Sequence, residues 1–241
     1  MNEHEGRKQN KMEQGILNTI EQGDCKAILP NLPKAKMIFA DPPDNLGLHY
    51  SGFNDRRAVL DCIELACEQA AIVWVSHYYK YLPEVLFHAK GCGDVRLFLW
   101  RFTFGQHRSS DCGNGYRPLI RIMQPGAALY PNAIREPSAR QTKYNDKRAN
   151  PAGRVPDDVW EFPRVCGTFS ERRKWHPNQH PEALIERIVK FSTRPGDLVI
   201  DMFAGTDTVN RVCKKLKRQC ISIEISPDYC KRIQAELGNR K

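Results

Sequence analysis

The sequence predicts an α/β fold built around a mainly parallel β-sheet, and three observations carry this prediction. Short apolar runs alternate with stretches of helical periodicity along most of the chain. The 241 residues, 41% of them hydrophobic, suffice for one sizeable core with a small appended region. The chain contains no apolar run of the roughly 18 residues that a membrane-spanning helix requires, so we expect no membrane contact.

The first half of the chain predicts four strands and one helix. Strands are expected where apolar runs are short and end at polar or turn residues, and these runs are 16–20, 37–40, 71–76 and 95–104. Residues 57–69 have helical periodicity instead. The polar N-terminus, 1–14, lacks the apolar core of a signal peptide, and we expect it to be disordered or flexible.

The amino-acid composition of the chain changes in its middle. Residues 105–163 are rich in Gly, Pro, Asn and Arg, and we expect an irregular surface region there. Regular structure is predicted to return at 182–192, where apolar residues form one helical stripe. The last predicted elements are a strand at 197–202, a helix at 208–216, a strand at 220–225 and a helix at 228–237.

Charge and cysteine content narrow the class of protein. The formal net charge is +9, and the stretch from Arg96 to Arg154 holds 11 Lys and Arg against three Asp and Glu. A basic excess confined to one stretch favours a polyanionic partner, of which nucleic acid is the obvious one. The nine cysteines form no CxxC pair, so we expect reduced thiols in a cytoplasmic protein and no metal site.

A candidate cofactor turn follows the predicted strand at 197–202. Small residues around Gly205 lead from this strand into a helix, which lets a ligand approach the backbone closely. Glu224 ends the next strand, 19 residues after Gly205, where a carboxylate can accept hydrogen bonds from both ribose hydroxyls of a nucleoside. The dinucleotide and P-loop fingerprints are both absent. The pattern therefore favours a turn that binds a nucleoside cofactor over an ordinary turn with a solvent-facing Glu224.

A second candidate site is the sequence Asp41-Pro42-Pro43-Asp44, at the carboxyl end of the predicted strand 37–40. The two prolines stiffen the backbone and remove two N–H donors. A carboxylate and free carbonyl oxygens remain, and this set can accept hydrogen bonds from an exocyclic amino group. Taken alone, the same tetrapeptide is also typical of an ordinary turn.

Together these motifs resemble the beta class of amino-DNA methyltransferases. That class has a D/S-P-P-aromatic motif first, a target-recognition region in the middle and an F-x-G-x-G motif near the C-terminus. Asp41-Pro42-Pro43, the basic stretch and Phe203-Ala204-Gly205 follow this order. Further segments that resemble the class are 23–25, 157–175, 176–185 and 223–229.

The resemblance implies a Rossmann-like, S-adenosylmethionine-dependent methyltransferase fold that acts on double-stranded DNA and releases S-adenosylhomocysteine. Residues 15–104 and 155–241 would form the catalytic core, and 105–154 the irregular, basic target-recognition insertion. The implied reaction is direct methylation of adenine N6, since an initial Asp leans toward adenine. Cytosine N4 is the alternative. A homodimer and a restriction partner are left open.

The resemblance also implies residue roles. The catalytic positions are Asp41, Pro42, Pro43 and Asp44. Those expected to bind the cofactor are Asp24, Cys25, Asp41, Gln179, His180, Asp201, Phe203, Ala204, Gly205, Thr206, Asp207, Thr208 and Glu224. Those expected to bind DNA are Arg108, Asn114, Tyr116, Arg117, Arg140, Lys143 and Arg148.

Two positions depart from the family pattern. Asp44 stands where the family has an aromatic ring that stacks on the flipped base, and Tyr50 or Phe53 is a hypothetical substitute. Asp207 replaces the second glycine of the cofactor turn, where its side chain either crowds the methionine moiety or bonds to its ammonium group. Because of these departures, a catalytically silent DNA-binding protein is an alternative interpretation. An RNA or protein amino-methyltransferase is a second alternative.

Overall fold

An eight-stranded sheet forms the centre of the molecule. The computed structural model describes residues 18–44, 46–47, 49–50, 53–54 and 60–238. The strand order is β1-β10-β9-β2-β5-β7-β6-β8, and the first five strands are mutually parallel. Strand β7 runs antiparallel to β5 and β6, and β8 pairs parallel to β6. The bounds are β1 Asn18–Gln22, β2 Ala35–Ala40, β5 Ala70–Ser76, β6 Asp94–Gln106, β7 Asn114–Met123, β8 Val159–Glu161, β9 Leu198–Asp201 and β10 Gln219–Glu224.

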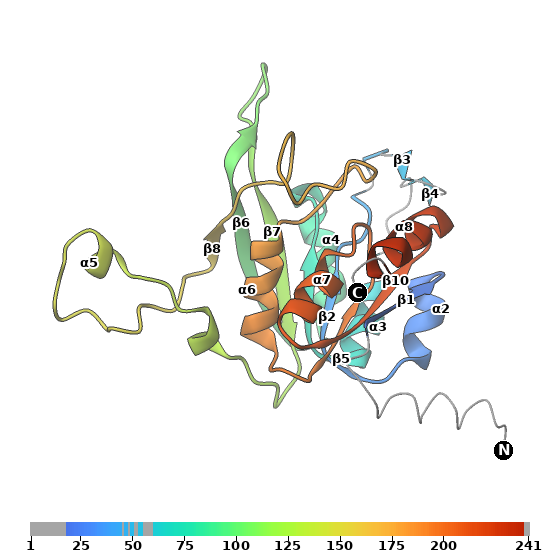
Figure 1. Ribbon diagram of the computed structural model, residues 1–241, viewed down its shortest axis with the longest axis horizontal. Coiled ribbons are helices and arrows are strands. Elements are labelled where there is room, and N and C mark those ends of the chain that lie inside the picture. The colour runs from blue at the N-terminus through green and yellow to red at the C-terminus, as the bar shows by residue number, and fades with distance from the viewer. Residues whose placement is uncertain (1–17, 45, 48, 51–52, 55–59, 239–241) are drawn as a thin grey trace.

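Helices cover both faces of the sheet (Figure 1). One face carries the apolar side chains of α2 (Cys25–Ile28), α3 (Cys62–Gln69) and α4 (Leu82–Ala89) in a single buried cluster. The other face packs against α6 (Glu182–Ser192) and α7 (Thr208–Lys215). The last helix, α8 (Pro227–Gly238), contacts β1 and β10.

Helix α6 shows how the sequence pattern becomes packing. Leu184, Ile185, Ile188 and Val189 are buried, as the stripe predicts, and each buried side chain of this size stabilises the fold by about 1.5–3 kcal/mol. Short elements complete the chain. They are the single turns η1 (Leu29–Asn31), η2 (Tyr79–Tyr81) and η3 (Pro131–Ile134), helix α5 (Ala139–Thr142), and a small hairpin of β3 (His49–Tyr50) and β4 (Phe53–Asn54).

The prediction of an irregular surface region at 105–163 is wrong for two segments, β7 and β8, and Trp160 of β8 is 1% exposed. Asn114–Met123 is strand β7, and its Leu119, Ile120 and Ile122 are fully buried in the sheet. The sequence conceals the strand because Pro118 and Arg121 interrupt the apolar run. Arg121 is nonetheless buried, and the charge of its guanidinium is compensated by the carboxylate of Asp94, 3.1 Å away.

Two segments extend from the body of the molecule (Figure 1). One is the end of the β6–β7 hairpin, around residues 104–114. The other carries α5 and is closed at its base by an antiparallel bridge between Glu136 and Arg154. The predicted disordered segment 1–14 lies outside the described residues. Among the described residues, no helix is long and apolar enough to cross a membrane.

Register places the candidate motifs at one edge of the sheet. Gln22 pairs with Glu224, so the turn after β1 begins beside the end of β10. Phe39 pairs with Asp201, and Ala40 pairs with Val75, so Asp41 emerges between β9 and β5. Ligands of open α/β sheets bind outside the carboxyl ends of the strands, and this edge is therefore the place to look for a site.

Candidate active site

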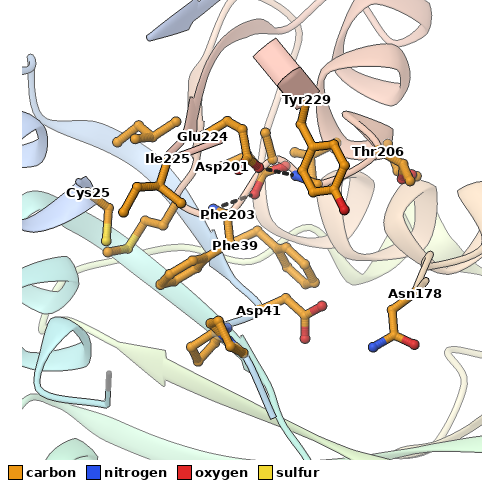
Figure 2. A pocket seen from close by; sticks show the side chains of 18 of the residues that line it. Cys25, Phe39, Asp41, Asn178, Asp201, Phe203, Thr206, Glu224, Ile225 and Tyr229 are labelled. Atoms are coloured by element: carbon orange, nitrogen blue, oxygen red, sulfur yellow. Dashed lines mark hydrogen bonds between the residues drawn. The ribbon is translucent and has the colours of Figure 1, made fainter. Parts of the chain in front are cut away.

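A pocket opens at this edge of the sheet, between the turns that follow β1, β2, β9 and β10 (Figure 2). Both sequence motifs contribute to its wall. Asp41 lines the pocket on one side and Glu224 on the other. In Figure 2 the carboxylate of Asp41 points into the pocket, on the side where Asn178 also lies. The structure therefore brings the two predicted half-sites together in one cavity.

Most of the residues predicted to bind the cofactor line this pocket. They are Asp24, Cys25, Asp41, Gln179, His180, Asp201, Phe203, Ala204, Gly205, Thr206, Thr208 and Glu224. Asp207 does not line it. Asn178, Phe39 and Tyr229 line it as well, although sequence reasoning did not select them. Asn178 lies directly before the Gln179-His180 pair, which is the one local signal that could have drawn attention to it.

The turn between β9 and α7 is built around Gly205. Its φ is +52°, which favours glycine, and a Cβ there would lie 3.2 Å from the imidazole of His176. The Gly205 N–H donates to Oε2 of Glu224 at 2.9 Å, and the Ser226 N–H donates to Oε1 at 2.8 Å. Each carboxylate oxygen keeps a further acceptor site. Glu224 is therefore held in place and can still accept hydrogen bonds from a ligand.

Asp207 faces away from the pocket. Its backbone is left-handed (φ 59°, ψ 33°), a conformation that glycine adopts freely and that Asp tolerates better than most residues. Its Oδ1 accepts a hydrogen bond from the Ser222 hydroxyl at 2.8 Å, inside the core. Burial raises the pKa of Asp207 to about 7. Neither outcome expected from the sequence, crowding a ligand or bonding to it, fits this orientation.

A deeper carboxyl group lies at the end of β9. Asp201 is buried, and one of its oxygens accepts the Phe203 N–H at 3.2 Å. Burial, reinforced by the neighbouring Asp207 carboxylate, raises the pKa of Asp201 well above its ordinary value. A cationic ligand in this pocket would favour the ionised form of Asp201 and would be attracted by it.

The turn after β1 forms an apolar end of the pocket. The side chain of Asp24 caps α2 by accepting the Lys26 N–H at 2.9 Å. The Gly23 N–H donates to the backbone oxygen of Glu224 at 2.9 Å, which fixes this turn against β10. Cys25, Phe203 and Ile225 lie together at this end (Figure 2). This end of the pocket suits a flat, apolar group such as a nucleobase.

Residues 176–180 divide between the two halves of the pocket. Gln179 uses its carboxamide to hold the chain, since Oε1 accepts the Arg173 N–H and Nε2 donates to the Glu171 oxygen. His180 belongs to the Asp41 side, where its Nε2 is 2.9 Å from the Ser76 hydroxyl and its Nδ1 is 3.4 Å from Asp41. Burial lowers the pKa of His180, so its imidazole is neutral at pH 7.

Arg117 is the centre of the corner formed by Asp41-Pro42-Pro43-Asp44. It extends from β7, and its Nε donates to the Ser76 hydroxyl at 2.7 Å. Its two terminal nitrogens each donate to one oxygen of Asp44 at 2.8 Å, and Nη2 also donates to Asp41 at 2.7 Å. Arg117 was expected to contact DNA, and the structure places its guanidinium in the wall of the pocket, beside Asp41.

Charge compensation sets the ionisation of this corner. Burial works to raise the pKa of Asp41, but the opposing charge of Arg117 is the strongest of the contributions that outweigh it and keep the value low. Burial alone would lower the pKa of Arg117, and the carboxylates of Asp41 and Asp44 raise it instead. His77 lies beside Asp44, and burial lowers its pKa. Asp41, Asp44 and Arg117 together therefore carry a formal net charge of −1.

The other residues predicted to contact DNA lie in two groups outside the pocket. Arg108, Asn114 and Tyr116 are on the β6–β7 hairpin, and Arg108 donates to the Tyr78 hydroxyl at 3.3 Å. Tyr78 in turn donates its N–H to Asp44, so this group adjoins the corner formed by Asp41-Pro42-Pro43-Asp44. Arg140, Lys143 and Arg148 are exposed on the segment around α5, which extends away from the pocket (Figure 1).

Tyr50, one of the two rings suggested as substitutes for a stacking aromatic residue, lies against Asn178 and His176. The Tyr50 hydroxyl accepts a hydrogen bond from Asn178 at 3.2 Å, and its ring lies 5.6 Å from that of His176. Tyr50 therefore lies on the side of the cofactor turn. The side chain of Phe53 lies outside the described residues.

Comparison with known proteins identifies a family. The N6/N4 methylase family model, described as a DNA methylase, matches residues 35–236. The DNA adenine methyltransferase YhdJ of Escherichia coli (strain K12) is 28% identical over 237 residues, which cover 88% of this chain and 80% of YhdJ. The type II methyltransferase M.HpaI of Haemophilus parainfluenzae is 31% identical over 224 residues, which cover 84% of this chain and 68% of M.HpaI.

Solved structures confirm the predicted fold class. The complex of M1.HpyAVI with SAM superimposes with a TM-score of 0.63 at 18% identity, over 90% of this chain and 98% of M1.HpyAVI. The PvuII DNA methyltransferase, described as cytosine-N4-specific, gives a TM-score of 0.64 at 16% identity, over 88% of this chain and 83% of that chain. At these identities the likeness concerns the fold alone.

Proposed function

The chain belongs to the N6/N4 DNA methylase family of S-adenosylmethionine-dependent enzymes, and we propose that it methylates N6 of adenine in double-stranded DNA. One observation carries the proposal. A partly buried carboxylate, Asp41, is kept ionised by Arg117 and faces the same pocket as the ribose-type acceptor Glu224. An acceptor for an amino group and a nucleoside site thus share one cavity.

The pocket fits S-adenosylmethionine by the chemistry of its walls. Cys25, Phe203 and Ile225 offer apolar surface for the adenine ring, and the Glu224 carboxylate can accept from the ribose hydroxyls. Asp201 and Asp41 make the rest of the cavity favourable for cations. When bound, the cofactor supplies an activated methyl group on a sulfonium. The remaining work falls to residues of the chain.

In the proposed mechanism Asp41 orients and polarises the target amine. Its carboxylate accepts an N–H of the base, and the backbone oxygen of Pro43 is the second expected acceptor. The prolines hold this corner rigid, so the amine is positioned with little further loss of freedom. Transfer would break the bond between the methyl carbon and the sulfonium sulfur and place positive charge on the amine nitrogen. The adjacent carboxylate of Asp41 would stabilise that charge until the nitrogen loses a proton to it or to solvent. No cysteine nucleophile is needed for this direct transfer.

Adenine is preferred over cytosine for two reasons. The acceptor motif, Asp41-Pro42-Pro43-Asp44, begins with Asp. In the family that the sequence resembles, an initial Asp is more typical of methylation of adenine. YhdJ is named a DNA adenine methyltransferase and matches most of this chain. Cytosine N4 remains the second candidate, because the PvuII enzyme, which shares the fold, is described as cytosine-N4-specific.

We further propose that the basic middle of the chain, within 105–154, engages DNA. The β6–β7 hairpin brings Arg108 and Tyr116 close to the catalytic corner through Tyr78 and Tyr79. The segment around α5 offers exposed basic side chains for phosphate contacts farther out. A homodimer stays a prediction, and sedimentation of the free protein is its direct measurement.

The proposal is tested by methyl transfer from radiolabelled S-adenosylmethionine to unmethylated genomic DNA. The variant Asp41→Asn keeps the shape of the side chain but removes its charge, and a loss of at least about 100-fold in single-turnover rate is expected. Glu68→Gln, an exposed change on α3, is the matched control and should transfer at the wild-type rate. Full activity in Asp41→Asn would contradict the assignment.

A further inference from the structure

The fourth residue of the acceptor motif is chemically unlike its counterpart in the family. Asp44 is 5% exposed and cannot stack on a flipped base. Its carboxylate holds the guanidinium of Arg117 with two parallel hydrogen bonds of 2.8 Å. Such a bidentate pair fixes the plane of a guanidinium as well as its position. The motif and Arg117 therefore form one unit.

The edges of that guanidinium are almost fully occupied. Its Nε binds Ser76, Nη1 binds Asp44, and Nη2 binds both Asp44 and Asp41. These bonds use four of the five N–H donors that an arginine carries. Arg117 can therefore donate few further hydrogen bonds to a base. Its two flat faces are the surfaces that remain for contact with one.

The faces of the guanidinium are not covered by a ring in the described part of the chain. Seven arginine or lysine side chains there lie over aromatic rings, as Arg187 does over Trp160 and Phe162, and Arg117 is not among them. Its side chain is 16% exposed and lines the pocket beside Asp41. The guanidinium thus lies in the pocket wall, beside the carboxylate that is expected to bind the target amine.

We propose that the guanidinium face of Arg117, held in position by Asp44, stacks on the flipped base in place of the missing aromatic ring. The inference rests on the proposed function. Arginine planes stack on nucleobases in other protein–nucleic acid contacts, which makes the substitution chemically sound. Because Asp44 offsets the charge of Arg117, the corner keeps the net charge of −1 that a lone Asp41 would give.

Three variants separate stacking from mere charge compensation. Arg117→Lys keeps the charge and loses the plane, and methyl transfer should fall roughly 10- to 100-fold, the range that base stacking supplies. In the double variant Asp44→Asn with Arg117→Leu the charge stays balanced but no stacking surface exists, and the same loss is expected. Asp44→Tyr with Arg117→Leu restores the family pattern. Both double variants lack the charge that keeps the pKa of Asp41 low, so they are compared with each other at the pH where each rate reaches its plateau, and the Tyr variant should be at least about 10-fold faster than the Asn variant.

A second measurement reports base flipping and does not depend on methyl transfer. Sequencing of DNA methylated by the wild-type protein gives the target site, and 2-aminopurine is then placed at the target base. The fluorescence rise on binding reports the flipped base. It should be large for the wild-type protein, small for Arg117→Lys and for Asp44→Asn with Arg117→Leu, and quenched by the phenol ring in Asp44→Tyr with Arg117→Leu. Calorimetric binding of S-adenosylhomocysteine should stay unchanged in all of them.

The outcomes distinguish this inference from the proposed function. A wild-type protein that transfers no methyl group to DNA would contradict the proposed function, and the inference with it. An active wild-type protein whose Arg117→Lys variant keeps its rate and its fluorescence rise would overturn only the stacking role. Equal recovery by the Asn and Tyr double variants would overturn it too, because Arg117 would then be a counter-charge alone.

Discussion

The buried carboxyl of Asp207 predicts how the stability of the protein depends on pH. Its pKa is about 7 in the fold, because burial disfavours the charged form, against an ordinary value of 3.8 in the unfolded chain. Below pH 4 both states carry the proton, and folding is not penalised. Between pH 4 and 7 only the unfolded state ionises, so the free energy of unfolding falls as the pH rises. Above pH 7 the penalty is complete.

The size of this penalty follows from the two pKa values. Their difference corresponds to about 4 kcal/mol at 25 °C. Asp207→Asn cannot ionise, tolerates the left-handed backbone, and keeps an oxygen that can accept the Ser222 hydroxyl. We therefore expect the variant to be more stable than the wild-type protein by about 4 kcal/mol at pH 8 and by less than about 1 kcal/mol at pH 4.

Urea unfolding at several pH values between 4 and 8 measures this difference directly. Removal of the Asp207 carboxylate also lowers the raised pKa of Asp201, and this adds to the stabilisation of Asp207→Asn at high pH. The exposed change Glu68→Gln should follow the wild-type curve throughout. Parallel curves for Asp207→Asn and the wild-type protein would refute the reasoning, since they would mean that Asp207 ionises in the fold as it does in the unfolded chain.

Three further predictions concern cofactor binding, the stability of the turn at Gly205 and DNA binding. Glu224→Gln keeps the shape of the side chain and removes its charge, so calorimetry should show S-adenosylhomocysteine binding weakened roughly 10-fold or more, and unchanged affinity would contradict the ribose role. Gly205→Ala places a Cβ 3.2 Å from the His176 ring on a left-handed backbone, and we expect a loss of about 1–2 kcal/mol in unfolding free energy. Lys143→Ala should lower the salt dependence of DNA binding by about one counterion without changing the sequence preference, and an unchanged slope would place Lys143 outside the DNA contact.

The sequence predicted best those features that are encoded locally. The turn around Gly205 and the acid at Glu224 lie on consecutive elements, and their spacing alone indicated a nucleoside site. Asp41 was found in the same way, because a proline pair after an apolar run marks the end of a strand. Each of these signals occupies a few residues and survives without knowledge of the packing.

The role of Arg117 could not be predicted in this way. Its network joins the ends of β2 and β5 to β7, and nothing in the sequence ties position 117 to position 44. Strand β7 itself was not recognised, since Pro118 and Arg121 disguise a buried run. Asp44 was recognised as unusual. Its compensating partner became visible only when antiparallel pairing brought β7 beside β5.

The orientation of Asp207 was also beyond the reach of the sequence. Its place in the motif indicated contact with the cofactor, because the family has a glycine there. The left-handed backbone turns the side chain toward Ser222 on β10, and only the pairing of β9 with β10 determines what lies on that side. The same backbone conformation explains why a glycine suits the position.

The central claim is that Asp41 and the nucleoside pocket together methylate an adenine amino group in DNA. Its most direct test is mass spectrometry of nucleosides from unmethylated DNA that has been incubated with the wild-type protein and S-adenosylmethionine. We predict N6-methyladenine as the product, and its absence with Asp41→Asn. N4-methylcytosine in its place would contradict the assignment of the base, and the absence of any methylated nucleoside would contradict the account as a whole.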